Sequence, residues 1–358
     1  MFAPRPDSYC SFRSRSIPPA RRGTLVLAGL CGLVLLLLSG CDGLGLFGGN
    51  DNFDVPAERL VSMTAVYEET HESGRPVHRL IVADMENPSN YQVLSEAGTD
   101  AGRSCFGPEK RRLLFEDNSE TNVGSRAPIK LLDLETREVR DLGATGTLKG
   151  CVWRADGSGF YYAAGGPAGL TVSTFYDLET DEAGIFAQSE SGATVIPYGR
   201  KGRDSILVLS NDSLAPGPAD RPAFYFVDAE TGEYLTQIEN EHLRFVPRED
   251  PDRGAWKKSA FTPAYNDTRD LIAFRRNDVE SGVNNIAVTD REGSFMELYR
   301  SGSFPEWGPN RSILFTRRSF EDYREARAMV IDTEENTVRP LAEPQTIDEA
   351  EGLRLPDY

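Results

Sequence analysis

The sequence predicts an all-β fold built from repeated units of short antiparallel strands, and three observations support this class. From about residue 58 onward, an apolar strand that ends in Asp and runs into a turn recurs along the chain. The copies recur at the period of roughly 40–50 residues that is typical of four-stranded repeats. No stretch between them has the length and 3.6-residue periodicity of an ordinary amphipathic helix.

The clearest marker of the repeat is the aspartate at the strand end. Asp favours a turn because its side chain bonds the backbone downstream, and a following Gly accepts positive φ. The markers are Asp84, Asp133, Asp177, Asp228, Asp290 and Asp332. Their successive spacings are 49, 44, 51, 62 and 42 residues.

A second marker, an aromatic residue followed by a Pro, Asp or Gly turn, precedes each Asp from the second copy onward. It is clearest at Trp153-Arg154-Ala155-Asp156-Gly157 and Trp307-Gly308-Pro309-Asn310, and it recurs at Phe106 and Phe261. The fourth copy, at Tyr198, is degenerate. A strongly apolar strand follows each copy, so each unit is predicted to contain four short strands. The aromatic residues are expected to pack in the core between units.

Four short antiparallel strands at this period are typical of one propeller blade. Six Asp markers predict a six-bladed β-propeller over residues 58–358, with seven blades as the alternative. The 62-residue interval has room for an insertion but hardly for a further blade. The segment 352–358 repeats the innermost-strand motif at Leu355-Pro356-Asp357. It is expected to complete the first blade and remove exposed sheet edges; a frayed tail is the alternative.

These markers resemble the TolB-type propeller repeat (WD40-like, or PD40), whose motif runs Pro-x-Trp-Ser-Pro-Asp-Gly before an apolar strand. The resemblance covers residues 58 to about 343 and is best in the third and sixth units. Arg154 or Gly308 replaces the motif's Ser, and the Asp-Gly pair is complete only at Asp156-Gly157. The repeat occurs in many envelope and peptidase-associated propellers, so the resemblance implies a fold rather than an activity.

Residues 1–40 are predicted to be an export signal. A basic region containing Arg21 and Arg22 precedes an apolar run from Leu25 to Leu38, followed by Ser39-Gly40-Cys41. A basic flank, a short apolar core and small residues at the cut are typical of a signal peptide. The run is also shorter than the ~20 residues of a membrane-spanning helix.

Leu-Ser-Gly-Cys resembles the bacterial lipobox, which implies that Cys41 carries a lipid anchor. An uncleaved anchor helix is the alternative. Residues 41–57 are rich in Gly and Asp and are expected to form a flexible tether. The propeller would then lie in the cell envelope at the inner or outer membrane, exposed to the periplasm or the cell surface.

The charge balance limits the partners. The chain carries 39 basic and 56 acidic residues, and the signal holds five Arg and one Asp, which leaves 34 − 55 = −21 for residues 41–358. This charge disfavours nucleic acid and anionic headgroups. The expected partners are the membrane, through the lipid on Cys41, and a protein or cell-wall component at one propeller face.

The sequence contains no nucleophile elbow, no His-Glu-x-x-His, no phosphate-binding loop and no calcium-binding loop of the Asp-x-Asp-x-Asp-Gly type. We therefore expect no catalytic residue, metal or cofactor. Glu69, His71 and His78 would share one face of a hairpin about Ser73-Gly74, but a solvated charged face explains them more simply.

A non-catalytic binding platform is the expected function. One alternative is a polysaccharide lyase or hydrolase acting at the central channel. The other is a scaffold lipoprotein in outer-membrane protein assembly.

Two segments that do not follow the repeat pattern are the candidate contact sites. Trp256 is the large aromatic outside the repeat pattern and lies in the charged stretch 248–258, and a long loop begins at Asn211. Aromatic and Arg side chains dominate binding surfaces, and loops tend to carry function. The binding candidates are Trp256, Arg253, Lys257, Asn211 and Asp212.

Cys105 and Cys151 are the cysteines that follow Cys41, and an oxidising envelope would permit them to pair. Cys105 precedes Phe106 by one residue, whereas Cys151 precedes Trp153 by two. The two thiols therefore have opposite parity on neighbouring inner strands. Because a disulfide needs converging Cβ vectors, this parity argues against the bridge.

Overall fold

The computed structural model describes residues 53–354, except for 71–75, 88–89, 96–98, 120–125, 166–170, 188–194, 212–221, 248–255, 279–282, 309–311, 319–325, 341–345 and 349–352. The chain divides into two units, Met1–Leu44 and Gly45–Tyr358, and every described residue belongs to the second. The predicted signal peptide and Cys41 therefore lie outside the described residues.

The described strands form five antiparallel sheets. The first, in the order β24-β25-β1-β2-β3, contains β1 (Leu60–Thr70), β2 (Pro76–Asp84), β3 (Tyr91–Val93), β24 (Thr346–Asp348) and β25 (Leu353–Arg354). The second, in the order β10-β9-β8-β7-β6-β5-β4, contains β4 (Ala101–Phe106), β5 (Arg112–Asp117), β6 (Ala127–Asp133), β7 (Val139–Trp153), β8 (Gly159–Gly165), β9 (Thr171–Asp177) and β10 (Glu182–Ala187).

The remaining three sheets follow the sequence order of their strands. The third contains β11 (Val195–Lys201), β12 (Ser205–Ser210), β13 (Ala223–Asp228) and β14 (Tyr234–Gln237). The fourth contains β15 (Val246–Pro247), β16 (Trp256–Asn266), β17 (Leu271–Asp278), β18 (Val283–Asp290) and β19 (Met296–Ser301). The fifth contains β20 (Ser303–Trp307), β21 (Ser312–Arg318), β22 (Ala326–Asp332) and β23 (Thr337–Pro340). Short 3-10 helices occur at η1 (Ala57–Arg59), η2 (Pro108–Lys110) and η4 (Glu241–Leu243).

The 15-residue strand β7 joins two four-stranded units into the seven-stranded second sheet. Its first part pairs with β6, where Val139 lies opposite Leu132. Its last part pairs with β8, where Trp153 lies opposite Phe160. The predicted all-β class with four-stranded antiparallel units is thus confirmed, whereas six as the number of blades stays a prediction.

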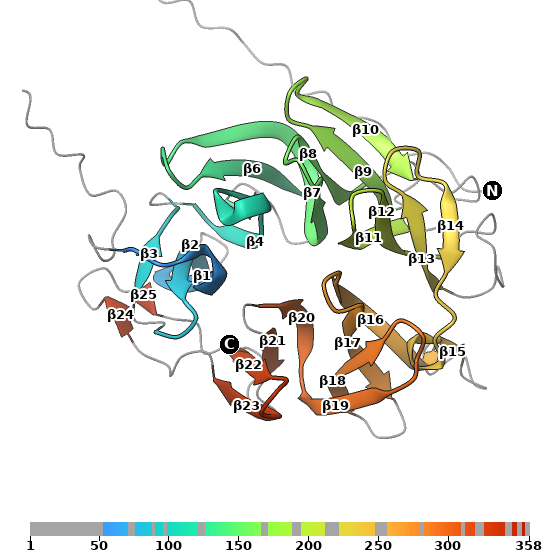
Figure 1. The fold of residues 1–358 in the computed structure, drawn as a ribbon. Helices are drawn as coiled ribbons and strands as arrows, with labels where there is room; N and C mark the ends of the chain where they lie inside the picture. The colour runs from blue at the N-terminus through green and yellow to red at the C-terminus, as the bar shows by residue number, and fades with distance from the viewer. Residues whose placement is uncertain are drawn as a thin grey trace, which may run out of the picture. The chain divides into compact units, whose positions relative to one another are not determined.

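The sheets stand around a common axis (Figure 1). The strand nearest the axis in each described unit from the second onward contacts the next such strand, in the order β4, β7, β11, β16 and β20. We call these five the inner strands. Apolar side chains fill the interfaces between neighbouring units, for example Leu114 against Phe160 and Leu207 against Phe274. Burying one such side chain contributes about 1.5–3 kcal/mol, so the interfaces hold the ring together.

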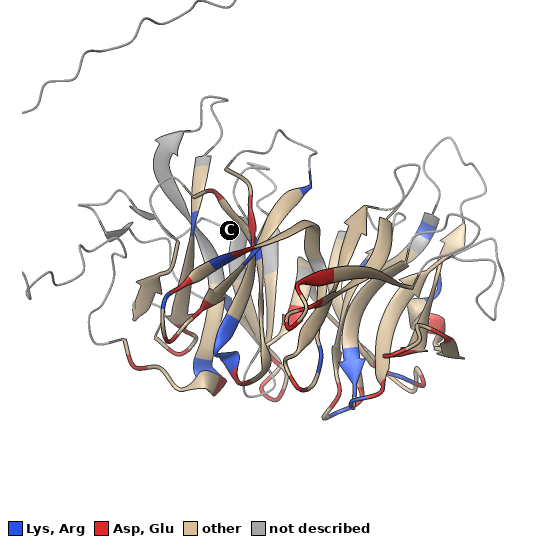
Figure 2. Ribbon diagram, turned by 90° about the horizontal axis from the view of Figure 1, so that it is seen from above, with Lys and Arg blue, Asp and Glu red and all other residues tan. Residues whose placement is uncertain are grey.

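The repeated aspartates have a structural role. Asp228 accepts hydrogen bonds through one carboxylate oxygen from the backbone N–H of Glu230 at 2.9 Å and of Thr231 at 2.8 Å. The same arrangement recurs at Asp133, Asp177 and Asp332. Bonds to backbone N–H groups stabilise the ionised carboxylate and lower the pKa of each of these residues. Figure 2 shows charged residues gathered in turns along the lower edge of the sheets.

The aromatic markers bind each unit to the one before it. The indole N–H of Trp153 donates to the carbonyl of Cys105 at 3.4 Å, and that of Trp307 donates to the carbonyl of Ala264 at 2.9 Å. Each bond joins one inner strand to its predecessor. Phe261 packs edge-on against Phe245 in the same kind of interface. Their predicted place in the core between units is confirmed.

Two contacts join the two ends of the repeat region. β25 pairs with β1, with Arg354 opposite Val66 and Leu353 opposite Tyr67. The hydroxyl of Ser312, on β21, lies 3.3 Å from the sulfur of Met85, which follows β2. Both contacts connect the first sheet to C-terminal strands, whereas residues 355–358 lie outside the described residues.

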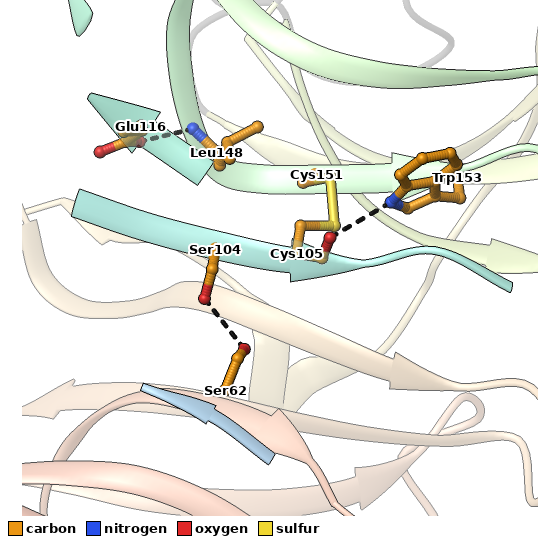
Figure 3. The surroundings of a disulfide bond; sticks show 7 residues. All are labelled: Ser62, Ser104, Cys105, Glu116, Leu148, Cys151 and Trp153. Atoms are coloured by element: carbon orange, nitrogen blue, oxygen red, sulfur yellow. Dashed lines mark hydrogen bonds between the residues drawn. A yellow bond between two sulfur atoms is a disulfide. The ribbon is translucent and has the colours of Figure 1, made fainter. Parts of the chain in front are cut away.

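Cys105 and Cys151 form a disulfide, with their Cα atoms 6.2 Å apart (Figure 3). The prediction against this bridge was wrong. It assumed that two bonded cysteines must point to the same face of their strands, whereas a bond between two neighbouring units needs side chains on opposite faces. Trp153 faces the preceding unit, and Cys151 shares its face. Cys105 points away from the side on which Ser104 bonds Ser62, so it faces the following unit. Opposite parity is therefore what brings the two thiols together across the interface.

Removing the disulfide is expected to destabilise the fold. The two cysteines are 46 residues apart, and the chain-entropy model gives ~4 kcal/mol for closing a loop of this length. The double variant Cys105→Ala/Cys151→Ala, which leaves no free thiol, should lose about 2–4 kcal/mol in urea unfolding. Reductant should lower the stability of the parent protein and leave the variant unchanged. A parent protein insensitive to reductant would contradict the bond.

Candidate functional site

The predicted contact residues are only partly described. Cys41, Asp212 and Arg253 lie outside the described residues. Asn211 is exposed just after β12, Trp256 is the first residue of β16, and Lys257 is half-buried beside it. Their role in binding stays a prediction.

The hairpin with the candidate histidines is only partly described. His78, on β2, lies opposite Val66 of β1, and His71 lies outside the described residues. The Nδ1 atom of His78 is 3.1 Å from a carboxylate oxygen of Asp100. Among the described residues, no group of three or more His, Cys, Asp or Glu side chains has an arrangement suited to a metal ion.

All five inner strands carry an irregularity in their pairing. A bulge takes residues out of the strict alternation of a strand and redirects their side chains, and bulges are frequent near binding and active sites. The register shifts lie between Ala101 and Ser104, Thr147 and Val152, Pro197 and Gly199, Phe261 and Ala264, and Ser303 and Glu306. Every described inner strand therefore departs from regular pairing close to the axis.

Four polar residues from different sheets lie at these bulges or opposite one of them, and we call them the axial cluster: Arg103, Tyr198, Arg275 and Glu306. Arg103 and Tyr198 lie within the bulges of β4 and β11, and Glu306 ends the bulge of β20. The charge of Arg103 acts on both Tyr198 and Glu306, and that of Arg275 acts on Tyr198. The charges of Arg103 and Arg275 thus influence ionisable groups that belong to other sheets.

Glu306 is exposed to solvent as a residue, although many protein atoms lie around its carboxyl group. The surrounding protein raises the pKa of its carboxyl, and the positive charge of Arg103 partly opposes this shift. Burial likewise raises the pKa of Tyr198, against the opposing charges of Arg103 and Arg275. Groups whose pKa is perturbed are candidates for function, although ion pairs and burial of a purely structural kind perturb pKa values too.

A buried carboxylate holds the bulges of β4 and β7 in place. Glu116 is only 8% exposed and accepts a hydrogen bond from the hydroxyl of Thr147 at 2.9 Å. It also accepts one from the backbone N–H of Leu148 at 2.6 Å (Figure 3). Its other oxygen accepts from the backbone N–H of Arg103 at 3.3 Å. The guanidinium of Arg103 donates to the hydroxyl of Thr147 at 3.0 Å. The position of Arg103 is thus fixed through both its backbone and its side chain.

Gly150 permits the close approach of β7 to β11. A Cβ atom at this position would lie 1.9 Å from the carbonyl oxygen of Pro197, so no larger residue fits without moving the backbone. Tyr198 follows directly on Pro197. The spacing at Gly150 therefore helps to set where Tyr198 lies relative to the axis.

Two hollows of about 270 and 470 Å³ lie on either side of residues 237–239, at the outermost strand of the third sheet. The larger hollow is lined by Phe226, Leu235 and Ile238, with Lys201 and Arg291 among its charged residues. Both lie at β14, whereas Tyr198 lies on the inner strand of that sheet, so they are separate from the axial cluster.

The comparisons with known proteins support the fold. The chain is similar to the TolB structure from Acinetobacter baumannii, with a TM-score of 0.56 and 13% identity over 82% of this chain and 63% of that one. It is also similar to a TolB candidate from Agrobacterium tumefaciens, with a TM-score of 0.52 and 10% identity over 79% of this chain and 89% of that one. A third similar structure is the β-propeller domain of the Trilobed protease from Pyrococcus furiosus. Its TM-score is 0.51, and the identity is 12% over 80% of this chain and 95% of that one.

At these identities the similarity shows the fold alone, which is that of TolB and related β-propellers. No protein-family model and no curated protein matches the sequence. Within the described residues, no helix is long and apolar enough to cross a membrane.

Glu306 is expected to make stability depend on pH. Its folded-state pKa lies above the ordinary value of 4.5, so the folded protein binds the proton more tightly than the unfolded chain. The contribution of Glu306 to the free energy of unfolding is most favourable below pH 4.5, and it declines as the pH rises through the raised pKa. The Gln side chain of Glu306→Gln cannot ionise. The melting temperature of this variant, relative to that of the parent protein, should therefore rise as the pH increases above 4.5. Glu182→Gln, on exposed β10, is the control, and an equal pH profile for both variants would contradict the raised pKa of Glu306.

Proposed function

We propose that the protein is a non-catalytic, lipid-anchored component of the cell envelope that uses its propeller as a binding platform for a protein or polymer partner. The axial cluster is the observation that carries this proposal, because it concentrates positioned charged and aromatic groups on a rigid scaffold. Binding sites typically combine such preformed geometry with a few placed polar groups.

The envelope location has three independent supports. The lipobox predicts lipidation of Cys41, the fold is shared with TolB structures, and the disulfide suits an oxidising compartment. Two attachment signals are normally needed for stable anchoring by single acyl chains. A diacylglyceryl group on Cys41 would provide two chains on one residue.

Lipidation can be tested in a bacterium that processes lipoproteins. With the full chain and radiolabelled palmitate, the parent protein should take up label and sediment with membranes. Cys41→Ala should lose the label and accumulate as a larger precursor, because the acceptor thiol is gone. Cys31→Ala, inside the apolar run, is the matched control and should still be labelled. An unlabelled parent protein would refute the anchor.

The partner can be sought by crosslinking in native membranes followed by mass spectrometry. A protein or cell-wall fragment crosslinked to the propeller would support the platform. Recovery of outer-membrane assembly components would favour the scaffold role in particular. Crosslinks confined to this chain itself would count against a platform.

A second candidate function is an enzyme of the polysaccharide lyase or hydrolase type at the axis. The observation in its favour is Glu306, whose raised pKa beside Arg103 suits a general acid or base. The full chain, incubated with cell-wall and uronate polysaccharides, should then release shorter products, and Glu306→Gln should reduce the rate by 10²-fold or more, on the order expected for acid–base catalysis. An unchanged rate in the variant would remove this candidate.

A further inference from the structure

The two edges of the ring carry different connections. Neighbouring inner strands run in the same direction, because Trp153, at the end of β7, bonds the carbonyl of Cys105, near the end of β4. The repeated Asp turns lie at this same end, since the N–H of Leu178, just after β9, donates to the carbonyl of Ser158, just after β7. We call the edge with the Asp turns the turn edge. The opposite edge, where the inner strands begin and the second strands lead into the third, is the loop edge.

The chain reaches the first sheet at the turn edge. Leu60, the first residue of β1, lies opposite Asp84. The carbonyl of Leu60 accepts a hydrogen bond from the Nζ of Lys110, in the short helix η2 that follows the inner strand β4. Upstream of β1, Phe53 and Val55 are partly buried against the core cluster that contains Leu60. The chain is therefore attached to the turn edge from Phe53 onward.

Only a short segment separates this attachment from the predicted lipid. Phe53 lies 12 positions after Cys41. That distance allows a reach of at most ~40 Å, and a Gly-rich chain of this length spans ~20 Å on average. A six-residue strand such as β13 also rises about 20 Å between the two edges. Bringing the loop edge to the membrane would stretch the segment beyond its average reach, which costs conformational entropy.

The charge of the turn edge affects how closely it approaches lipid. From Asp133 to Asp332, the five repeated Asp turns hold 3, 4, 3, 2 and 3 acidic residues within their first six positions. The same positions hold two basic residues, Arg137 and Arg291. This acidic edge repels anionic headgroups over about one Debye length, ~8–10 Å at moderate ionic strength. Since the segment before Phe53 reaches further than that, the turn edge can face a membrane without lying against it.

We propose that the turn edge faces the membrane that holds the lipid on Cys41, and that the loop edge faces away from it and meets the partner. This inference rests on the proposed lipid anchor and platform, and it states from which side the partner arrives. Asn211, just after β12, and Trp256, the first residue of β16, both lie at the loop edge. A partner that contacts them approaches from the compartment beyond the propeller rather than from the anchoring membrane.

Energy transfer to the membrane surface tests this orientation. Glu233 and Glu239 are both exposed and flank the same outer strand, β14, at the turn edge and the loop edge respectively. A dye on Glu233→Cys or on Glu239→Cys therefore reports one edge each after the same change of charge. Cys105 and Cys151 are bonded to each other and take up no dye.

The full chain, lipidated in a bacterium that processes lipoproteins, is placed in phosphatidylcholine vesicles that contain a headgroup-labelled acceptor lipid. Transfer from Glu233→Cys should exceed that from Glu239→Cys about twofold, because ~20 Å of strand separates the two labels. Phosphatidylglycerol in the vesicles should lower the transfer from Glu233→Cys at low salt, and added salt should restore it. Equal melting temperatures of both variants and the parent protein show that the labels leave the fold intact.

Two further variants test the cause of the orientation. Cys41→Ala should abolish transfer from both labels, because the chain no longer binds the vesicle. An insertion of about 24 Gly and Ser residues between Gly48 and Gly49 should bring the two transfers closer together, because the reach of such a chain grows with its length.

Equal transfer from the two labels, or more from Glu239→Cys, would overturn the inference, and so would a difference that the insertion leaves unchanged. A parent protein that takes up no palmitate would refute the proposed anchor and this orientation with it. Palmitate uptake together with equal transfer would leave the anchor standing and remove the orientation alone.

Discussion

Packing between neighbouring sheets is the interaction on which the rest of this structure depends. A four-stranded sheet of this kind has two apolar faces, and alone it would leave both in water. The fully buried residues Leu114, Phe160 and Phe274 lie between units rather than within one. Each unit is therefore stable only beside its neighbours. The pairing of β25 with β1 and the contact of Ser312 with Met85 have the same consequence at the two ends of the repeat.

Crowding at the axis links this packing to the candidate site. Inner strands that converge on one line cannot all keep flat, regular pairing, and the register shifts in β4, β7, β11, β16 and β20 show how the chain accommodates them. Because Gly150 has no side chain, β7 can approach β11 closely at this position. Glu116 accepts hydrogen bonds from backbone N–H groups in the bulges of both β4 and β7. The redirected side chains of Arg103 and Tyr198 follow from the same geometry.

The repeat itself was predictable because its markers have local causes. Asp228 marks a turn since its carboxylate binds two backbone N–H groups close in sequence, and Trp153 marks a unit since its indole bonds the preceding one. The axial cluster was not predictable in this way. Arg103 and Glu306 are two charged residues among 95, and their positions depend on bulges in β4 and β20, two strands far apart in the sequence. A charged residue within an inner strand, just before the aromatic marker, was the one available signal.

The disulfide has a consequence for when the axis takes its final form. It ties β4, which carries Arg103, to β7, which carries Gly150 and packs against β11. Cytosolic reductants keep cysteine thiols reduced, whereas an oxidising compartment allows them to form a disulfide. In the proposed envelope location, a newly made chain would lock these two strands together only after export. Secretion would then time the maturation of the axis, so that the fully braced ring would first exist where an extracytoplasmic partner is met.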